Sequence, residues 1–186
     1  MFRSIAIALS IGLLAFVVGC GSSTSAHSAS GTGVTNATAR AATAFTCPTK
    51  STKKGAKTLF VVDAGLAAGA FKKWIYNPFK AGSFKKGTKG RIKSMIKAGI
   101  AGVFAVNRLK AAKVNAESDP LLCKLTIGPI TKLTSSLSSL ASRAKTGRLS
   151  PSDVEGSSAA LDQFKSASSG AGAPVKEENA SVPGLG

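Results

Sequence analysis

Residues 130–140, ITKLTSSLSSL, decide the fold. Large aliphatic side chains recur there at intervals of three, four and three residues, at Ile130, Leu133, Leu137 and Leu140. This spacing puts all four on one face of an α-helix, whereas the side chains of a strand would alternate. Asp119-Pro120 supplies a cap and first-turn pair for this helix, and Gly147 ends it. Gly128-Pro129 is expected to separate its first turns from the rest.

Helical spacing extends to both sides of this stretch. It predicts a helix over residues 58–76, ended by Asn77-Pro78, and a longer one over about 90–116. Ser150 caps a fourth predicted helix that ends near Ser168, with Pro151 at its first position. The chain shows no convincing strand alternation, so the expected fold class is all-α, a small bundle of three to four helices.

The first two predicted helices carry aliphatic stripes that are expected to face the core. The first stripe is Leu59, Val62, Leu66 and Ala70, with Phe60, Ala67, Phe71 and Trp74 beside it. The second is Ile92, Met95, Ile96, Ile100, Val103, Val106, Leu109 and Val114. Two glycine pairs, Gly65 with Gly69 and Gly99 with Gly102, indicate that these two helices cross closely, because small residues let backbones approach.

The N-terminus has the pattern of an export signal. Arg3 precedes about 14 mostly apolar residues, fewer than a membrane-spanning helix needs. The end of this run, Val17-Val18-Gly19-Cys20, resembles the lipobox of bacterial lipoproteins. The resemblance implies that residues 1–19 are a signal peptide and that Cys20 carries lipid, including palmitate, on the extracytoplasmic face of the cell membrane. The alternative is an ordinary signal cut elsewhere, with Cys20 an accidental apolar residue.

Composition predicts the domain organisation. Residues 20–44 are rich in Gly, Ser, Thr and Ala without apolar periodicity, so we expect a flexible tether that reaches about 25–30 Å. Residues 45–169 form the predicted basic helical domain. Residues 170–186 are rich in Gly, Ala, Pro and Glu and are expected to be a disordered tail.

Cysteine usage predicts one disulfide. If Cys20 is lipidated, Cys47 and Cys123 remain of the three cysteines, and an oxidising compartment favours their pairing. The alternative is two free buried thiols. The chain has no CxxC pair, so redox catalysis is not expected.

Positive charge dominates the predicted domain. Residues 45–149 hold 21 Lys and Arg against three acidic residues, and between Ala64 and Ala116 twelve basic residues occur without an acidic one. Lysines outnumber arginines 19 to 6 over the chain. Lys is a hydrated point charge, whereas Arg offers the bidentate fork that specific recognition uses, so the composition favours diffuse attraction to an anionic surface.

Residues for catalysis are scarce. His27, the one histidine of the chain, lies in the predicted tether, so a histidine-based triad or zinc site in the domain is not expected. The loop GSFKKGTKG, residues 82–90, lacks the residue order of a phosphate-binding loop and is predicted to be a flexible basic turn. Glu117 and Asp119 are interpreted as a helix-end cap rather than a catalytic pair. No enzyme activity, cofactor or metal is predicted.

Aromatic and basic residues are interleaved over residues 71–86. This mixture suits docking at a membrane interface, and it suits single-stranded nucleic acid as a less favoured partner. The alternative is that the rings pack at a corner between two helices while lysines cover the outside. Within the segment, KWIYNPFKAGSF resembles stretches of uncharacterised secreted proteins of actinobacteria, which implies no activity. The candidate surface-binding residues are Lys72, Lys73, Trp74, Tyr76, Phe79, Lys80, Phe84, Lys85 and Lys86.

These observations predict a lipid-anchored protein whose basic helical domain makes non-enzymatic contact with an anionic envelope surface or partner, either anionic lipid or a cell-wall polymer. One rival function is a carrier that encloses a lipid-like molecule between the second and third predicted helices, and a dry pocket there would support it. The other is a small enzyme with an unfamiliar site, for which a buried cluster of Asp63, Glu117 or Asp119 with lysines would be the sign.

Overall fold

A computed structural model describes residues 46–185 of the chain. These residues form five α-helices and one π-helical turn, and none of them lies in a strand, which confirms the expected all-α bundle. The predicted signal peptide, Cys20 and the tether lie outside the described residues. In chain order the elements are α1 (Ala56–Phe71), η1 (Lys72–Tyr76), α2 (Asn77–Lys80), α3 (Arg91–Glu117), α4 (Pro120–Lys145) and α5 (Pro151–Gly170).

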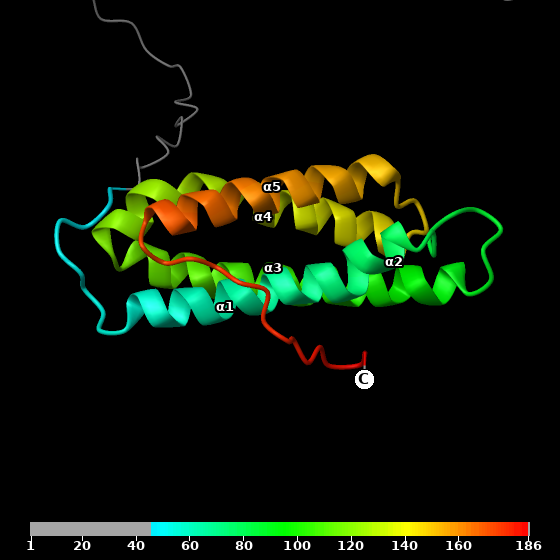
Figure 1. Cartoon of the computed structure of the whole chain (residues 1–186), viewed down its shortest axis with the longest axis horizontal. Helices are drawn as coiled ribbons and strands as arrows, with labels where there is room; N and C mark the ends of the chain where they lie inside the picture. The colour runs from blue at the N-terminus through cyan, green and yellow to red at the C-terminus, as the bar shows by residue number, and fades with distance from the viewer. Residues whose placement is uncertain (1–45, 186) are drawn as a thin grey trace, which may run out of the picture. The chain divides into compact units, whose positions relative to one another are not determined.

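The four long helices pack side by side, each antiparallel to the one before it (Figure 1). α3 contacts α1 on one side and α4 on the other, and α5 contacts α4. The bundle closes between α1 and α5, where the ring centroids of Phe60 and Phe164 lie 5.8 Å apart. This is the up-and-down arrangement that short connections between long helices favour.

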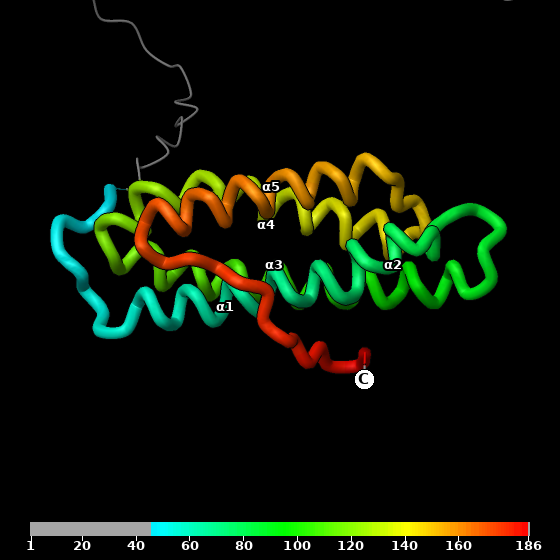
Figure 2. Tube along the Cα trace, in the orientation of Figure 1, coloured from blue at the N-terminus to red at the C-terminus, as the bar shows by residue number. Residues whose placement is uncertain are grey.

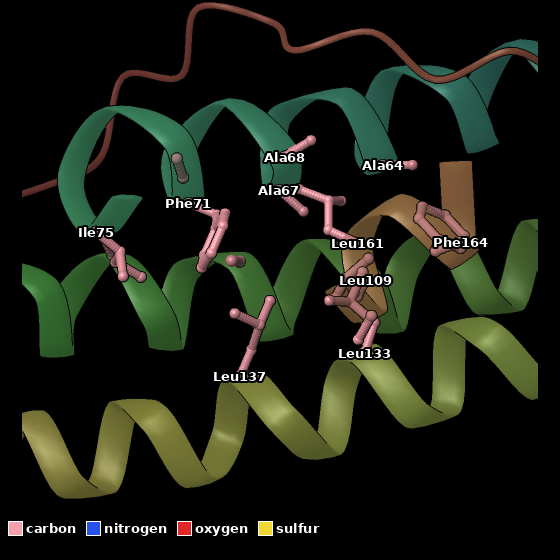
Figure 3. Packing of buried hydrophobic residues seen from close by; sticks show 14 of the residues in the cluster. Ala64, Ala67, Ala68, Phe71, Ile75, Leu109, Leu133, Leu137, Leu161 and Phe164 are labelled. Carbon is pink, nitrogen blue, oxygen red and sulfur yellow. The ribbon is translucent and has the colours of Figure 1, made fainter. Parts of the chain in front are cut away.

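In α3, α4 and α5, buried positions recur at intervals of three and four residues, whereas α1 buries every residue from Ala67 to Phe71. α3 buries Met95, Ala98, Gly102, Ala105, Leu109, Ala112 and Ala116, and α5 buries Val154, Ser157, Leu161, Phe164 and Ser168. α4 continues its aliphatic stripe in both directions, to Thr126 and Ala144. A repeat of about 3.5 residues keeps one seam of each helix turned toward its neighbours. Figure 3 shows Leu109, Leu133 and Leu161 meeting in the shared interior, with Leu137 one turn along α4.

The caps predicted for α4 and α5 are confirmed. One carboxylate oxygen of Asp119 accepts hydrogen bonds from the backbone N–H groups of Leu121 and Leu122, both at 3.1 Å. Ser150 and Asp153 form a reciprocal capping box, in which the Ser150 N–H donates to the Asp153 carboxylate over 2.9 Å. These side chains satisfy N–H groups that have no partner inside their helix.

The predicted break at Gly128-Pro129 is wrong, because α4 continues through Pro129. A proline inside a helix removes one backbone hydrogen bond and crowds the preceding turn, which costs about 3 kcal/mol. Thr126 and Ile130, on either side of this position, are fully buried. Packing of that face against the other helices therefore outweighs the local preference.

The first helical region also extends past its predicted end at Asn77-Pro78. The chain passes from α1 through η1 into α2, which ends at Lys80. The Asn77 N–H donates to the Lys72 carbonyl, five residues back, which is the spacing of a π turn. Pro78 follows at the second position of α2 and has no N–H, so one carbonyl of η1 lacks the helical hydrogen bond that another residue would donate there.

The aliphatic stripes predicted to face the core lie partly on the outside of α1 and α3, although Ala70 and the adjoining Phe60, Ala67 and Phe71 are buried on α1. Leu59 and Val62 are 43% and 48% exposed, and Ile92 and Ile96 are 73% and 53% exposed. Of the second stripe, Met95 and Leu109 are buried as predicted. Alanines build most of the remaining buried surface of both helices. The face of each helix that contacts its neighbours is the buried one, whatever the size of its side chains. Small residues on that face let the helices approach closely.

Both glycine pairs make close contacts, but the predicted crossing of α1 and α3 through them is wrong. A Cβ atom on Gly102 would lie 2.8 Å from that of Ala141, so this pair marks the contact of α3 with α4. On α1, a Cβ atom on Gly65 would lie 2.8 Å from the carbonyl oxygen of Lys176, and one on Gly69 would overlap that of Glu178. Gly65 and Gly69 thus leave room on α1 for the C-terminal segment of the chain.

The C-terminal segment, residues 171–185, runs back from α5 across α1 (Figure 2). The Glu178 N–H donates to the Gly65 carbonyl over 3.0 Å. The Glu177 carboxylate lies 2.8 Å from Nζ of Lys165 on α5 and 3.9 Å from Nζ of Lys72 on η1. The predicted disorder is therefore wrong for this segment, because α1 supplies a groove that composition alone does not reveal. The buried residues of the C-terminal segment are Ala171, Ala173, Val175, Ala180, Val182 and Leu185.

Cys47 and Cys123 form the predicted disulfide, with their Cα atoms 5.7 Å apart. The bond ties the residues before α1 to α4. Two hydrogen bonds act at the same end of the bundle: Ser51 donates to the Asp119 carboxylate over 3.0 Å, and Lys53 donates to the Asn115 side chain over 2.7 Å. The residues that lead into α1 are thus held against the ends of α3 and α4.

Candidate anion-binding surface

The candidate surface-binding residues divide into sheltered rings and exposed lysines. Phe84 is buried, and Trp74, Tyr76 and Phe79 are half-buried around η1 and α2. The rings therefore pack against the core while the lysines cover the outside, which is the alternative that the sequence left open. The exposed lysines are Lys72, Lys73, Lys80, Lys85 and Lys86.

Trp74 is already in contact with cations of this chain. Nζ of Lys73 lies 5.3 Å from its ring centroid, and Nζ of Lys97 lies 4.9 Å from it. Both distances are typical of cation–π contacts. The indole Nε1 is buried and has no acceptor among the described residues. The indole is thus engaged at the corner of the bundle rather than displayed for stacking on a partner.

The cluster does not form one surface. Lys72 and Lys73 lie near the C-terminal segment, around a small hollow that also includes Glu177. Phe79, Lys80, Phe84, Lys85 and Lys86 instead line a separate cavity at the end of the bundle where α2 ends. The structure therefore brings together five of the nine candidate residues.

This second hollow, the α2-end cavity, has a volume of about 560 Å³. Phe79, Phe84 and Leu149 contribute its large apolar side chains. Its charged residues are the cations Lys80, Lys85, Lys86 and Arg91 and one carboxylate, Glu155. The wall is built from α2, the α2–α3 loop, the start of α3, and the chain around the start of α5.

Arg91 joins the two sides of the α2-end cavity. Its Nε donates to the Phe84 carbonyl over 3.0 Å, and its Nη2 donates to the Gly147 carbonyl over 3.1 Å. Both acceptors are neutral, so the guanidinium keeps its net charge. Sequence reasoning missed Arg91, Leu149 and Glu155, because only the fold brings two parts of the chain so far apart in sequence to one end of the bundle.

The segment between Ala64 and Ala116, which we name the acid-free segment, contains no Asp or Glu, and most of its cations have no carboxylate partner. Three of its twelve Lys and Arg residues lie within salt-bridge distance of a carboxylate: Lys72, Arg108 and Lys113. The other nine have no such partner within residues 46–185. Their charge is therefore available to an external anion.

α3 presents an aliphatic stripe to the outside. Ile92, Ile96 and Val103 are 73%, 53% and 39% exposed, and Ile100 between them is half-buried. Spacings of four, four and three residues put these four side chains on one side of the helix, which we name the α3 outer face. Lys93 is exposed next to its first member. The stripe thus combines aliphatic surface with positive charge.

The acidic residues considered for catalysis each have a structural partner. Asp63 accepts hydrogen bonds from Arg108 and Asn115, both at 3.3 Å. Glu117 lies 3.4 Å from Nζ of Lys113, one turn earlier on α3. Asp119 caps α4. No group of three or more His, Cys, Asp or Glu residues within the described part of the chain could hold a metal ion.

Two carboxyl groups have lowered pKa values. Burial raises the pKa of Asp119, but hydrogen bonds from the Leu122 N–H and Ser51 together with the charge of Lys57 hold it below its ordinary value of 3.8. The hydrogen bond from Lys165 is the main cause that lowers the pKa of Glu177 below 4.5. Both groups are therefore ionised at neutral pH and act as fixed anions within the fold.

The contact between α3 and α4 is filled at the place where a carrier would need a dry pocket. Gly102 leaves no room for a Cβ atom beside Ala141, and a Cβ atom on Gly99 would lie 3.1 Å from Lys145. A hollow of about 450 Å³ opens on the surface along these helices, and Ser, Thr and Lys residues make up most of its lining. This open hollow at the surface lends no support to an enclosed lipid-like ligand.

Within residues 46–185, no helix combines the length and apolar character needed to cross a membrane. Comparison with protein-family models, curated protein sequences and solved structures finds no match to this chain.

Proposed function

We propose that this chain is a membrane-anchored lipoprotein whose basic helical domain makes non-enzymatic contact with an anionic lipid surface. The observation that carries the proposal is the set of nine cations on the acid-free segment without a carboxylate partner among the described residues. A Lys or Arg near an anionic membrane contributes about 1 kcal/mol of attraction. Several such residues acting together are enough for reversible docking.

The α3 outer face favours lipid over a purely polar polymer. Ile92 and Ile96 are its most exposed members, and Lys93 lies between them in sequence. Aliphatic residues beside lysines are typical of helices that lie in the membrane interface. In such a pose the isoleucines enter the boundary of the acyl chains while the long lysine side chain keeps its charge among the headgroups.

Attachment through Cys20 explains how this contact would be maintained. Two or three acyl chains on one residue hold far more firmly than a single chain, which binds only marginally. The tether predicted over residues 20–44 would keep the domain within about 25–30 Å of the bilayer. Because charge attraction falls off over about 8 Å at physiological salt, the domain docks only when its unpaired cations come within about that distance of the surface. Loss of fatty-acid labelling in Cys20→Ala tests the attachment.

Vesicle binding by an unlipidated chain tests the contact itself. Residues 20–186 carrying Cys20→Ala should sediment with vesicles that contain anionic lipid, detach as salt rises, and bind neutral vesicles weakly. Adding Ile92→Gln and Ile96→Gln should weaken binding without lowering Tm, because both side chains are exposed. The matched control is Leu121→Gln with Leu125→Gln on α4, which are 44% and 37% exposed, and it should bind like the parent chain.

Two results would contradict the proposal. One is equal, salt-insensitive binding to anionic and neutral vesicles. The other is no binding to either, which would leave a cell-wall polymer or a protein as the partner of the cationic surface.

A further inference from the structure

The α2-end cavity has features that contact with a flat surface does not require. Its volume of about 560 Å³ lies within the range of small-molecule sites, about 300–1,000 Å³. We propose that this cavity binds the phosphate headgroup of an anionic amphiphile and the first part of its hydrocarbon chain. The inference rests on the proposed function only for the source of that amphiphile, the adjoining lipid surface.

The cations of the cavity supply the headgroup site. Arg91 is fixed by its hydrogen bonds to the Phe84 and Gly147 carbonyls, so its guanidinium is positioned before any ligand arrives. Lys80, Lys85 and Lys86 are exposed and have no carboxylate within salt-bridge distance among the described residues. Phosphate can accept charge-assisted hydrogen bonds from several cations at once, and these are stronger than bonds between neutral groups.

The apolar side chains of the cavity supply a place for hydrocarbon. Phe84 and Leu149 are 9% and 8% exposed and form a fixed wall, while Phe79 on α2 is half-buried. These residues come from α2, the α2–α3 loop and the α4–α5 connection. An inorganic anion would use only the cations. A chain attached to the phosphate would also cover the apolar wall, which is the reason to infer an amphiphile.

Side chains, rather than the end of a helix, carry the recognition. Ser150 and Pro151 at the start of α5 line the cavity, but the Asp153 carboxylate already accepts the Ser150 N–H. The start of α5 is thus capped within the chain. Glu155 is the one carboxylate that lines the cavity, and it opposes a bound anion.

Titration calorimetry with dodecyl phosphate below its micelle concentration tests the inference. Residues 20–186 carrying Cys20→Ala should bind one molecule of dodecyl phosphate. Inorganic phosphate should bind at least about tenfold more weakly because it leaves the apolar wall uncovered. Dodecyl maltoside, which has the same chain and no charge, should not bind measurably.

Variants locate the site. Lys85→Gln with Lys86→Gln should weaken dodecyl phosphate binding at least about tenfold, since charge-assisted contacts are lost. The control Lys54→Gln with Lys124→Gln makes the same change in net charge at residues that do not line the cavity and should change affinity less than about twofold. Phe79→Ala should lower the affinity for dodecyl phosphate and leave the affinity for inorganic phosphate unchanged, and Glu155→Gln should raise the affinity for dodecyl phosphate. An unchanged Tm shows that each variant is folded.

Three outcomes would overturn the inference. The first is an equal loss of affinity for dodecyl phosphate in the two double lysine variants. The others are equal affinities for dodecyl phosphate and inorganic phosphate, or equal affinities for dodecyl phosphate and dodecyl maltoside. Equal affinity for the two phosphates would indicate a site for free phosphate instead of lipid. Salt-sensitive vesicle binding that persists in any of these cases leaves the proposed function standing. Loss of vesicle binding with retained dodecyl phosphate binding removes the membrane contact alone.

Discussion

Gly69 is the residue at which the C-terminal segment comes closest to a helix. Any Cβ atom there would overlap the Glu178 carbonyl, and Gly65 one turn earlier accepts the Glu178 N–H. A carbonyl oxygen belongs to the backbone and cannot rotate away as a flexible side chain would. The conformation of a whole segment therefore depends on the absence of one methyl group.

We predict that Gly69→Ala lowers stability and releases the C-terminal segment. Helix propensity by itself favours Ala over Gly by about 1 kcal/mol, but overpacking costs about 1–3 kcal/mol. Tm should fall, and trypsin should cleave at Lys176 faster than in the parent chain.

The matched control is Gly156→Ala on α5, where nothing lies within 4 Å of the added Cβ atom. Only the propensity gain acts there, so Tm should rise. If Gly69→Ala also raised Tm and left cleavage at Lys176 unchanged, the close contact would not hold the segment.

At the scale of the element, α4 shows how tertiary packing overrides a local signal. Pro129 lies inside a helix of 26 residues whose aliphatic stripe continues on both sides of it. A kink or break would turn part of that stripe away from α3 and α5, so the helix continues despite the missing hydrogen bond.

We predict that Pro129→Ala stabilises the protein. The substitution restores an N–H opposite the Leu125 carbonyl, four residues back, and removes the ring that crowds it. The gain should be at most about 3 kcal/mol and is measured as a rise in Tm or in the denaturant midpoint.

Pro151→Ala is the control, since Pro151 occupies the first position of α5, where proline is well tolerated. It should leave Tm nearly unchanged. A lower Tm for Pro129→Ala would mean that packing of the proline ring stabilises the protein by more than the missing hydrogen bond costs.

At the scale of the whole molecule, the disulfide and the C-terminal segment close the bundle on different sides. Cys47 and Cys123 are 76 residues apart in sequence, so their bond joins the start of the described chain to α4. Glu177 connects η1 and α5 through Lys72 and Lys165. Both connections link elements that the short loops between helices do not join.

We predict that reduction of the disulfide lowers the free energy of unfolding by up to about 4–5 kcal/mol, because the unfolded chain regains the freedom of a long loop. The Cys20→Ala chain should show no titratable thiol when denatured without reductant. Its Tm should fall after reduction, and Cys47→Ala with Cys123→Ala should match the reduced parent.

Two thiols in the unreduced, denatured chain would contradict this prediction. An unchanged Tm after complete reduction would show instead that the bond forms but does not limit the unfolded chain.

Part of the fold and of the candidate site could be predicted from sequence because the signals are local. The spacing of Ile130, Leu133 and Leu137 identifies the buried seam of α4 within a few turns. Asp119 and Ser150 act on N–H groups two or three residues away, so their roles as caps can be inferred without tertiary structure. The exposed lysines of the candidate site follow in the same way from the local excess of charge.

The rest depends on partners that are distant in sequence. Ile92 and Ile96 are more apolar than the alanines beside them, yet they lie outside, because the seam of α3 is set by where α1 and α4 pack. Arg91 and Leu149 meet only because an antiparallel bundle returns the chain to the same end. The sequence by itself determined that the fold is helical, where α4 and α5 are capped, and the excess of positive charge, and it favoured the disulfide pairing once Cys20 is set aside, because these depend on short-range chemistry and on counting. Only the tertiary structure decided which faces are buried, which groove holds the C-terminal segment and which cations surround a cavity, since these follow from contacts between whole helices.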